Sequence, residues 1–476
     1  MINNISNMLL NKRILYSLLL IVLLIPTFFI HTQKYPDWGD DFAQYVYQSQ
    51  QIHTPSLKYN KVLNIEEYSS SKRSVFFSVI LSVIKPTLQI QNYVNVISIS
   101  YIFAGLICFI FFSNYFTLSI SFIASLAVSY NFLILRLKSE IVPEFIFMAL
   151  FYGVLYLIYN NKKCVKYVIP ILLGLLVSVR FVGLSLLLSY ICFILFQKDK
   201  VIKDKLKTIT ITIVIFTMAI SCINYFFLSN INNQEVKLYS SVIFQEYELN
   251  MFFGNISRYS HYILYFFEQE IPYWMNTIIT FFAFTFFIIG FVISGIKQKN
   301  ICHLAFVFYF LFLLCYPYNG DNIKYLIPIM PLVFYFMIFG LKAILELIKI
   351  KYSNIILVAS LSIVFLSNSK TIWLAIKHNS ANIGPYELSV LKDFEVIQQK
   401  VKITETIAFG KPFIINLLAD RDAYFLSQKN YSQVFLKANY VLSAKPCVQE
   451  LYPKIKDIPI SRGDTTELTN FYLIKL

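Results

Sequence analysis

Long apolar runs separated by short polar joints occupy most of the chain. A run of about 17 to 25 apolar residues is long enough to cross the hydrocarbon core of a membrane as a helix. Runs of this kind lie at 14–30, 93–113, 116–135, 142–160, 167–178, 182–197, 208–228, 273–296, 301–316, 325–347 and 352–369. The pattern predicts an α-helical polytopic membrane domain over residues 1–369, with about eleven transmembrane helices.

The first polar loop, residues 31–73, and the segment after it contain two stretches of a different kind. Residues 40–51 have a polar helical pattern without the apolarity to cross a bilayer. Residues 74–85 are apolar but too short to span it. Both stretches are typical of helices that lie along the membrane surface. We therefore expect two interfacial helices in this region.

Hydropathy falls after residue 370, and the periodicity changes. Residues 385–400 show the spacing of an amphipathic helix. Short β-rich runs follow at 404–409, 412–418, 438–443 and 470–476. The tail 370–476 is therefore expected to be a small α/β domain outside the membrane.

The composition excludes an ordinary water-soluble domain. Hydrophobic residues make up 57% of the 476 residues and charged residues only 14%. A soluble protein needs more charged residues to cover its surface. The excess apolar surface must therefore face lipid.

The positions of the basic residues indicate how the chain crosses the membrane. The formal net charge is +15, which taken alone would suggest a nucleic-acid partner. Lys and Arg are instead concentrated in alternate short joints, at 1–13, 161–166, 198–207, 297–299 and 349–351. This is the positive-inside asymmetry of membrane proteins. It predicts a cytoplasmic N-terminus, a multi-pass protein of the cytoplasmic (inner) membrane, an extracytoplasmic C-terminal domain, and no nucleic-acid partner.

The N-terminal apolar run and the cysteines add two expectations. The run 14–30 follows Lys12 and Arg13 as a signal peptide would, but it is long for one and lacks a small-residue cleavage site, so it is interpreted as a retained anchor. Of the seven cysteines, only Cys447 falls in the outward tail. No disulfide framework is expected there. No Cys/His zinc motif is present, so no metal ligand is assigned, although a divalent metal ion stays open as a cofactor.

An acidic pair opens the first predicted surface helix. Asp40 and Asp41 follow a glycine, and helical spacing places Asp41, Tyr45 and Gln48 on one face. A carboxylate just outside the membrane is suited to act as a general base on an acceptor hydroxyl. The alternative is that the pair only caps the helix and favours its positive end.

A second charged group falls between two predicted membrane helices. Arg136, Lys138, Glu140 and Glu144 crowd one short outward turn around Pro143. Glu140 is suited to orient an acceptor or bind a metal, and Arg136 or Lys138 to hold a phosphate. The alternative is a solvated turn without a role in chemistry.

Two further cations lie at outer helix ends. Arg180 stands between two apolar runs, and Lys324 lies in the turn before the run 325–347. Each is a candidate ligand for a phosphate, although such side chains also extend to the interface without a function. In the tail, Asp420 and Asp422 resemble the DxD motif of nucleotide-sugar enzymes, but they follow a β run and are expected to form a turn.

In this order of parts the chain resembles the GT-C class of membrane glycosyltransferases, in particular the bacterial relatives of protein O-mannosyltransferases and of the lipid A aminoarabinose transferase. The run GDDFAQY at 39–45 is similar to the acidic pair that opens the first outer loop of that class. The segment 136–144 is similar to its acidic second outer loop. The run KYLIP at 324–328 looks like its Arg-Tyr-x-x-Pro motif with Lys substituted.

The resemblance implies an inverting glycosyltransferase that uses a polyprenyl-phosphate-linked sugar as donor and a lipid, glycan or protein of the envelope as acceptor. It implies that Asp40 is the catalytic base, with Asp41 as its orienting partner and Glu140 as support. Tyr45 and Tyr325 would line the substrate. The candidates for the donor phosphate are Arg136, Lys138, Arg180, Lys324, Lys72 and Arg73, although the last two lack the neighbouring prolines of the class.

Two other classes of membrane protein share this hydropathy. A transporter is expected to place ionisable groups near the middle of its helices, often beside broken helices. The charged groups here gather in outer loops, which favours an enzyme that works at the membrane surface. An envelope polysaccharide polymerase or ligase also carries large outer loops with cations, and it remains the alternative.

Overall fold

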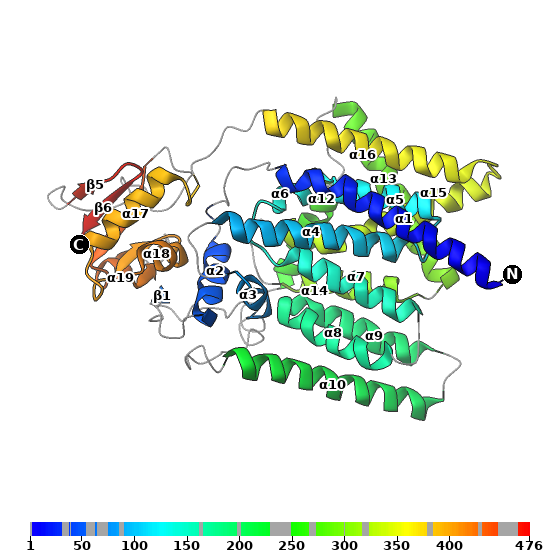
Figure 1. Ribbon diagram of the computed structural model, residues 1–476, viewed down its shortest axis with the longest axis horizontal. Coiled ribbons are helices and arrows are strands. Elements are labelled where there is room, and N and C mark those ends of the chain that lie inside the picture. The colour runs from blue at the N-terminus through cyan, green and yellow to red at the C-terminus, as the bar shows by residue number, and fades with distance from the viewer. Residues whose placement is uncertain are drawn as a thin grey trace.

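The structure is a computed structural model that describes residues 2–30, 38, 40–53, 62–63, 75–84, 90–160, 165–197, 201–228, 249–265, 273–298, 300–316, 323–377, 384–426, 431–445 and 465–476. Its apolar helices lie side by side, and a small domain with a sheet sits at one end of them (Figure 1). The N-terminus lies at the opposite end from this domain (Figure 1).

Each apolar run that was predicted to cross the membrane falls on a helix. Among the described residues, six segments are long and apolar enough to span a bilayer, and five apolar helices are shorter. The chain is therefore a polytopic α-helical membrane protein. The helices are α1 (Ile2–Phe29), α4 (Ile90–Phe112), α5 (Leu118–Ser129), α7 (Glu144–Asn160), α8 (Val165–Val179), α9 (Leu184–Phe196), α10 (Ile202–Leu228), α13 (Tyr273–Gln298), α14 (Ile301–Leu314), α15 (Met330–Leu347) and α16 (Ser353–Lys377).

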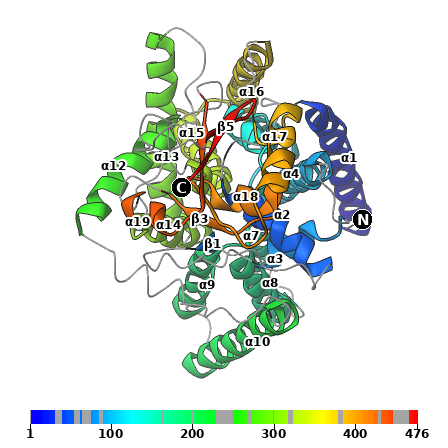
Figure 2. The same ribbon diagram turned by 90° about the vertical axis from the view of Figure 1, so that its left-hand side faces the viewer.

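The helices differ in how much of their surface other helices cover. The span that ends in α15 is 72% buried, whereas the span in α10 is 6% buried. Figure 2 shows α10 at the rim of the assembly. Beyond Lys207 the uncovered surface of α10 is largely apolar, so this part must face lipid rather than water. The centre of the domain is built from α4, α7 and α15, whose aromatic side chains interlock.

Two glycines allow α13 and α15 to approach each other closely. A Cβ atom on Gly290 would overlap the carbonyl oxygen of Phe336, and one on Gly340 would overlap the carbonyl oxygen of Phe286. Close backbone packing at small residues is a main source of stability between membrane helices, because lipid offers no hydrophobic driving force. The crossing fixes α15 and, with it, the turn that precedes α15.

The two predicted surface helices are confirmed as helices. They are α2 (Asp40–His53) and α3 (Val75–Leu81), and α2 lies across the ends of the membrane helices (Figure 1). The ring of Tyr45 packs edge-on against Phe77 at 4.7 Å between centroids. Ser78 Oγ donates a 2.9 Å hydrogen bond to Gln48 Oε1. One face of α2 is thus held by α3.

In the part of the membrane domain that the structure describes, two further helices lie outside the long spans. The short helix α6 (Phe132–Leu137) follows α5, and α12 (Leu249–Tyr265) belongs to the long loop after α10. In α12, Asn255 Nδ2 donates to the carbonyl oxygens of Leu314 at 3.1 Å and Tyr316 at 2.9 Å. These bonds satisfy carbonyls that the C-terminal end of α14 leaves open.

A six-stranded sheet organises the C-terminal domain, in the order β1-β3-β2-β4-β6-β5. Strands β1, β3, β2 and β4 are parallel, and β6 and β5 are antiparallel to their neighbours. Strand β1 comes from the first outer loop, where Val62 pairs with Ala423. The elements are β1 (Val62–Leu63), α17 (Leu388–Lys400), β2 (Ile407–Phe409), α18 (Pro412–Ala419), β3 (Ala423–Phe425), α19 (Tyr431–Phe435), β4 (Tyr440–Ala444), β5 (Thr465–Glu467) and β6 (Phe471–Lys475).

One β prediction in this domain is wrong. Residues 412–418 form helix α18, not a strand. A short apolar run does not distinguish a strand from a buried helix, and Pro412 at the first helical position favours the helix. The helix predicted at 385–400 and the β runs at 404–409, 438–443 and 470–476 are confirmed as α17, β2, β4 and β6.

The Asp420–Asp422 segment is the turn between α18 and β3. Asp420 ends α18 in a left-handed conformation with φ of 53°. The guanidinium of Arg421 is buried and donates to the carbonyl oxygens of Val401 at 2.7 Å and Asp420 at 2.8 Å. The segment therefore joins the ends of α17 and α18.

Candidate active site

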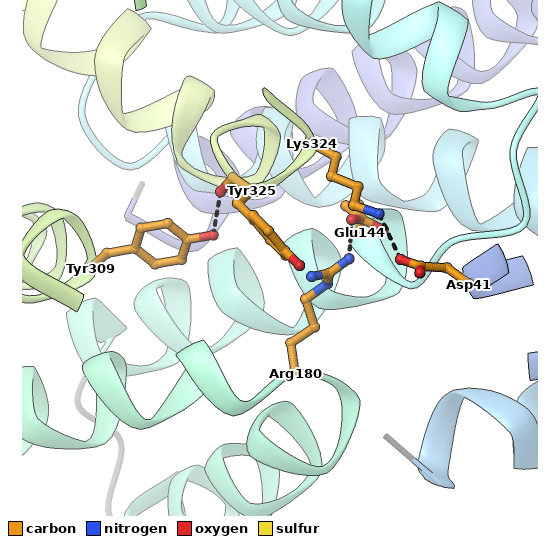
Figure 3. Close-up of polar contacts among 6 residues, drawn as sticks. All are labelled: Asp41, Glu144, Arg180, Tyr309, Lys324 and Tyr325. Carbon is orange, nitrogen blue, oxygen red and sulfur yellow. Dashed lines mark hydrogen bonds and ion pairs between the residues drawn. The ribbon is translucent and has the colours of Figure 1, made fainter. Parts of the chain in front are cut away.

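Side chains from four distant parts of the chain meet at the ends of the membrane helices nearest the C-terminal domain. They are Asp41 from α2, Glu144 from the start of α7, Arg180 before the 3-10 turn η1 (Phe181–Gly183), and Lys324 with Tyr325 from the turn η2 (Ile323–Tyr325). Figure 3 shows them converging on one another. We call Asp41, Glu144, Arg180 and Lys324 the charged cluster.

The first ion pair of the cluster is partly open to solvent. Lys324 Nζ donates to Asp41 Oδ2 at 2.6 Å across 283 residues of sequence. The two side chains are 21% and 24% exposed. The Lys324 ammonium also lies 5.8 Å from the centre of the Tyr325 ring. Because an ammonium carries three hydrogen-bond donors, Lys324 can bind a second anion in addition to the Asp41 carboxylate.

The second ion pair is more deeply buried. Arg180 Nη2 donates to Glu144 Oε1, and the Glu144 side chain is fully buried while that of Arg180 is 13% exposed (Figure 3). The Arg180 guanidinium lies 4.7 Å from the centre of the Tyr325 ring. Buried charges require partners of this kind, because leaving either one alone is costly.

Each member of the buried pair keeps one unused polar atom. Glu144 Oε2 and Arg180 Nε are buried and have no hydrogen-bond partner among the described residues. Buried polar atoms are normally satisfied by protein, water or ligand. The buried pair therefore leaves one acceptor and one donor that a polar ligand could satisfy.

Tyrosines hold the turn that carries Lys324. Tyr309 Oη donates to the carbonyl oxygen of Tyr325 at 2.7 Å. Tyr152 Oη donates to the carbonyl oxygen of Pro328 at 2.9 Å, within the second turn η3 (Ile327–Ile329), and accepts from Leu332 N at 3.1 Å. These bonds tie the Lys-Tyr-x-x-Pro segment to α14 and α7, so that Lys324 is presented from a rigid turn.

The two carboxylates of the cluster are engaged by cations. Within the part of the chain that the structure describes, no group of three or more His, Cys, Asp or Glu residues is arranged to hold a metal ion. Asp41 and Glu144 each accept from a basic side chain. In this arrangement the donor set does not fit a divalent cation, and the cluster is suited to bind an anion beside a carboxylate.

The predicted residues of the second outer loop lie in different places. Lys138 is buried, and its Nζ is 3.5 Å from Ser98 Oγ of α4. Burial lowers the pKa of Lys138 to about 8. Arg136 is exposed at the end of α6, and Glu140 is half-buried beyond it. Lys138 is thus directed to α4 and not to the ion pairs of the cluster.

Three predicted site residues lie wholly or partly outside the described part of the chain. Asp40 is the first residue of α2, but its side chain lies outside the described residues. Lys72 and Arg73 also lie outside them. The assignment of Asp40 as base and of Lys72 and Arg73 to the phosphate therefore stays a prediction.

Sequence reasoning gave Glu144 no role of its own. Glu144 lies in the same charged loop as Glu140, and from the sequence Glu140 is the residue expected to support the acceptor. A carboxylate at the first position of a membrane helix, followed by an arginine between the next two apolar runs, was the available signal. Because ionisable groups at membrane depth need oppositely charged partners, an ion pair between Glu144 and Arg180 could have been expected.

Comparison with known proteins identifies the fold. No family model and no curated protein sequence matches the chain. The oligosaccharyltransferase of Archaeoglobus fulgidus in the apo form superposes with a TM-score of 0.58 at 10% identity, over 90% of this chain and 69% of that chain. ArnT from Cupriavidus metallidurans bound to undecaprenyl phosphate gives 0.56 at 10% identity, over 97% of both chains. The chain has the GT-C fold.

The GT-C fold confirms the predicted architecture. Another structure of the archaeal protein, in complex with an inhibitory peptide and a dolichol-phosphate, has a TM-score of 0.54 at 11% identity over 90% of this chain. Identities this low establish the arrangement of helices and not the activity. The activity has to be argued from the charged cluster.

Proposed function

We propose that this GT-C protein is a membrane glycosyltransferase that transfers a sugar from a polyprenyl-phosphate-linked donor to an envelope lipid, glycan or protein. The observation that carries the proposal is the charged cluster, which places two cations beside carboxylates where the membrane helices end. The neighbours support the choice of donor, since ArnT was solved with undecaprenyl phosphate and the archaeal oligosaccharyltransferase with dolichol-phosphate.

Lys324 and Arg180 are the proposed ligands of the donor phosphate. The Lys324 ammonium is partly exposed, and Arg180 Nε is a donor with no hydrogen-bond partner among the described residues. Sugar transfer breaks the bond between the anomeric carbon and a phosphate oxygen, so negative charge grows on the phosphate. Fixed cations stabilise that charge more in a site that excludes water than they would in solution. Tyr325, stacked on Arg180, would line the same space.

The acidic pair supplies the proposed base. An acceptor hydroxyl attacks the anomeric carbon from the face opposite the phosphate, its proton passes to a carboxylate, and the configuration inverts. The Asp41 carboxylate is already engaged by the Lys324 ammonium. We therefore assign the base to Asp40, with Asp41 orienting Lys324 and Glu140 supporting the acceptor.

The proposed location is the cytoplasmic membrane, with the N-terminus inside and residues 370–476 outside. The basic joints support this orientation. The N-terminus and the C-terminal domain also lie at opposite ends of the helices (Figure 1). A reporter that is active only in the cytoplasm should be silent when it is fused after Leu476.

Deletion of the gene followed by complementation tests the function. Mass spectrometry of lipid extracts should show an accumulated polyprenyl-phosphate sugar, and envelope glycans or lipids should lack one sugar. The wild type should reverse both changes and Lys324→Gln should not. Lys342→Gln is a matched control, because Lys342 lies on α15 in an exposed pair with Glu346. Shortened polysaccharide chains without an accumulated single-sugar donor would instead favour a polymerase.

A further inference from the structure

The C-terminal domain holds the segment that leads into the acidic pair. Trp38 is only 3% exposed, and its ring packs edge-on against Phe471 of β6, with 5.8 Å between centroids and 76° between planes. Phe471 is fully buried and also contacts Phe394 of α17 at 5.8 Å and Phe409 of β2 at 6.1 Å. Trp38 is therefore part of the aromatic core of that domain, although it precedes Asp40 by only two residues.

Three other contacts join the same segment to the domain. The rings of Phe42 and Tyr386 lie 5.9 Å apart. Helix α2 packs against α18, and the two helices appear together in Figure 2. Beyond α2, strand β1 extends the sheet through the pairs Val62 with Ala423 and Leu63 with Tyr424. The first outer loop is thus attached to the domain before, along and after α2.

Other residues of α2 contact α3 and the turn before α15. Tyr45 and Gln48 contact α3, and Asp41 pairs with Lys324. The phosphate candidates Lys324 and Arg180 belong to segments next to α15 and α9. The acidic pair and the proposed phosphate ligands therefore belong to different segments, and α2, which carries the acidic pair, is packed against the C-terminal domain.

We propose that Trp38 is a positioning residue through which the C-terminal domain fixes the acidic pair over the donor site. This inference rests on the proposed function. A displacement of about 1 Å between reacting groups lowers turnover by roughly a hundredfold. Loss of the Trp38 contact should therefore reduce kcat while donor binding, which depends on Lys324 and Arg180, is retained.

Purified full-length Trp38→Ala and Trp38→Phe test the inference. In Trp38→Ala, kcat should fall about 10- to 100-fold with donor KM within about threefold of wild type. Trp38→Phe keeps an aromatic edge against Phe471 and should restore kcat to within about threefold. Trp373→Ala is the matched control, because Trp373 is an exposed tryptophan on α16 in contact with Lys377. It should behave as wild type.

Hydrogen exchange provides a readout that does not depend on activity. Backbone amides of α2 should exchange faster in Trp38→Ala, while those of α7 and α14 stay unchanged. The double variant Trp38→Ala/Phe471→Leu should have a kcat no lower than that of the more affected single variant. Both substitutions remove the same contact between Trp38 and Phe471. An unchanged kcat and unchanged α2 exchange in Trp38→Ala would overturn the inference. A wild type that transfers no sugar, with α2 exchange still raised, would overturn the proposed function alone.

Discussion

The buried pair of Glu144 and Arg180 gives the sharpest prediction about stability. Glu144 is fully buried, and Arg180 is its ion-pair partner. Arg180→Gln leaves the buried Glu144 carboxylate without its hydrogen-bonded cation, whereas Glu144→Gln leaves the Arg180 guanidinium without its carboxylate. Removing one partner of a buried pair costs about 3–5 kcal/mol, because the remaining charge loses its compensation. Each single variant should lose stability of that order.

The double variant Arg180→Gln/Glu144→Gln removes both charges. Two amides of similar size can hydrogen-bond to each other, and neither leaves a buried charge. The double variant should therefore be at least as stable as either single variant, although the two single losses together would amount to about 6–10 kcal/mol.

The assay is equilibrium unfolding of the purified proteins in mixed detergent micelles, followed by circular dichroism. The matched pair for comparison is Lys342 and Glu346 on α15, where the side chains are 37% and 58% exposed. The same cycle there should show a coupling of about 0.5 kcal/mol or less. Single losses below about 1 kcal/mol at Arg180 and Glu144, or a double variant with additive losses, would refute the burial argument.

Three further predictions each concern the substitution of a single residue. Lys324→Gln should change stability by about 1 kcal/mol or less, since its pair is partly exposed, yet weaken donor binding at least about tenfold; normal donor affinity by calorimetry would assign the phosphate elsewhere. The pKa of Lys138 is lowered to about 8 in the folded protein, so between pH 8 and 10.5 the unfolded chain binds this proton and the folded protein does not. The free energy of unfolding should therefore rise by up to about 3 kcal/mol over this pH range. Lys138→Met should remove this rise in pH-dependent unfolding, and a rise that persists in the variant would contradict the argument. Gly290→Ala should lower the thermal midpoint by forcing α13 away from α15, whereas Gly153→Ala, with open space at its Cβ, should not; equal midpoints would contradict the close crossing.

The membrane domain could be predicted because length and hydropathy report directly on crossing a bilayer. Each predicted run coincides with a helix, and the helical patterns at 40–51 and 74–85 became α2 and α3. The C-terminal domain was less predictable. Residues 412–418 are apolar in either conformation, and the two-residue strand β1 has no pattern that separates it from a loop.

Three of the four residues of the charged cluster could be proposed as candidates from the sequence, but their pairing could not. The sequence identified Asp41, Arg180 and Lys324 by type and by their position at outer helix ends. It did not contain the pairing of Asp41 with Lys324, because 283 residues separate them and only the packing of α2 against the membrane helices brings them together. Trp38 had no local signal either, since its partner Phe471 lies in the last strand.

The central claim is that the acidic pair at the start of α2 performs glycosyl transfer beside the charged cluster. Asp40→Asn keeps the volume of the side chain and most of its ability to cap a helix, but it removes the proton acceptor. The rate of sugar transfer should be measured for the purified wild type and for Asp40→Asn, with the same concentration of folded protein in both assays. We predict that turnover falls roughly a hundredfold or more while donor binding is retained. Near-normal turnover in Asp40→Asn would contradict the account and shift the base to Asp41.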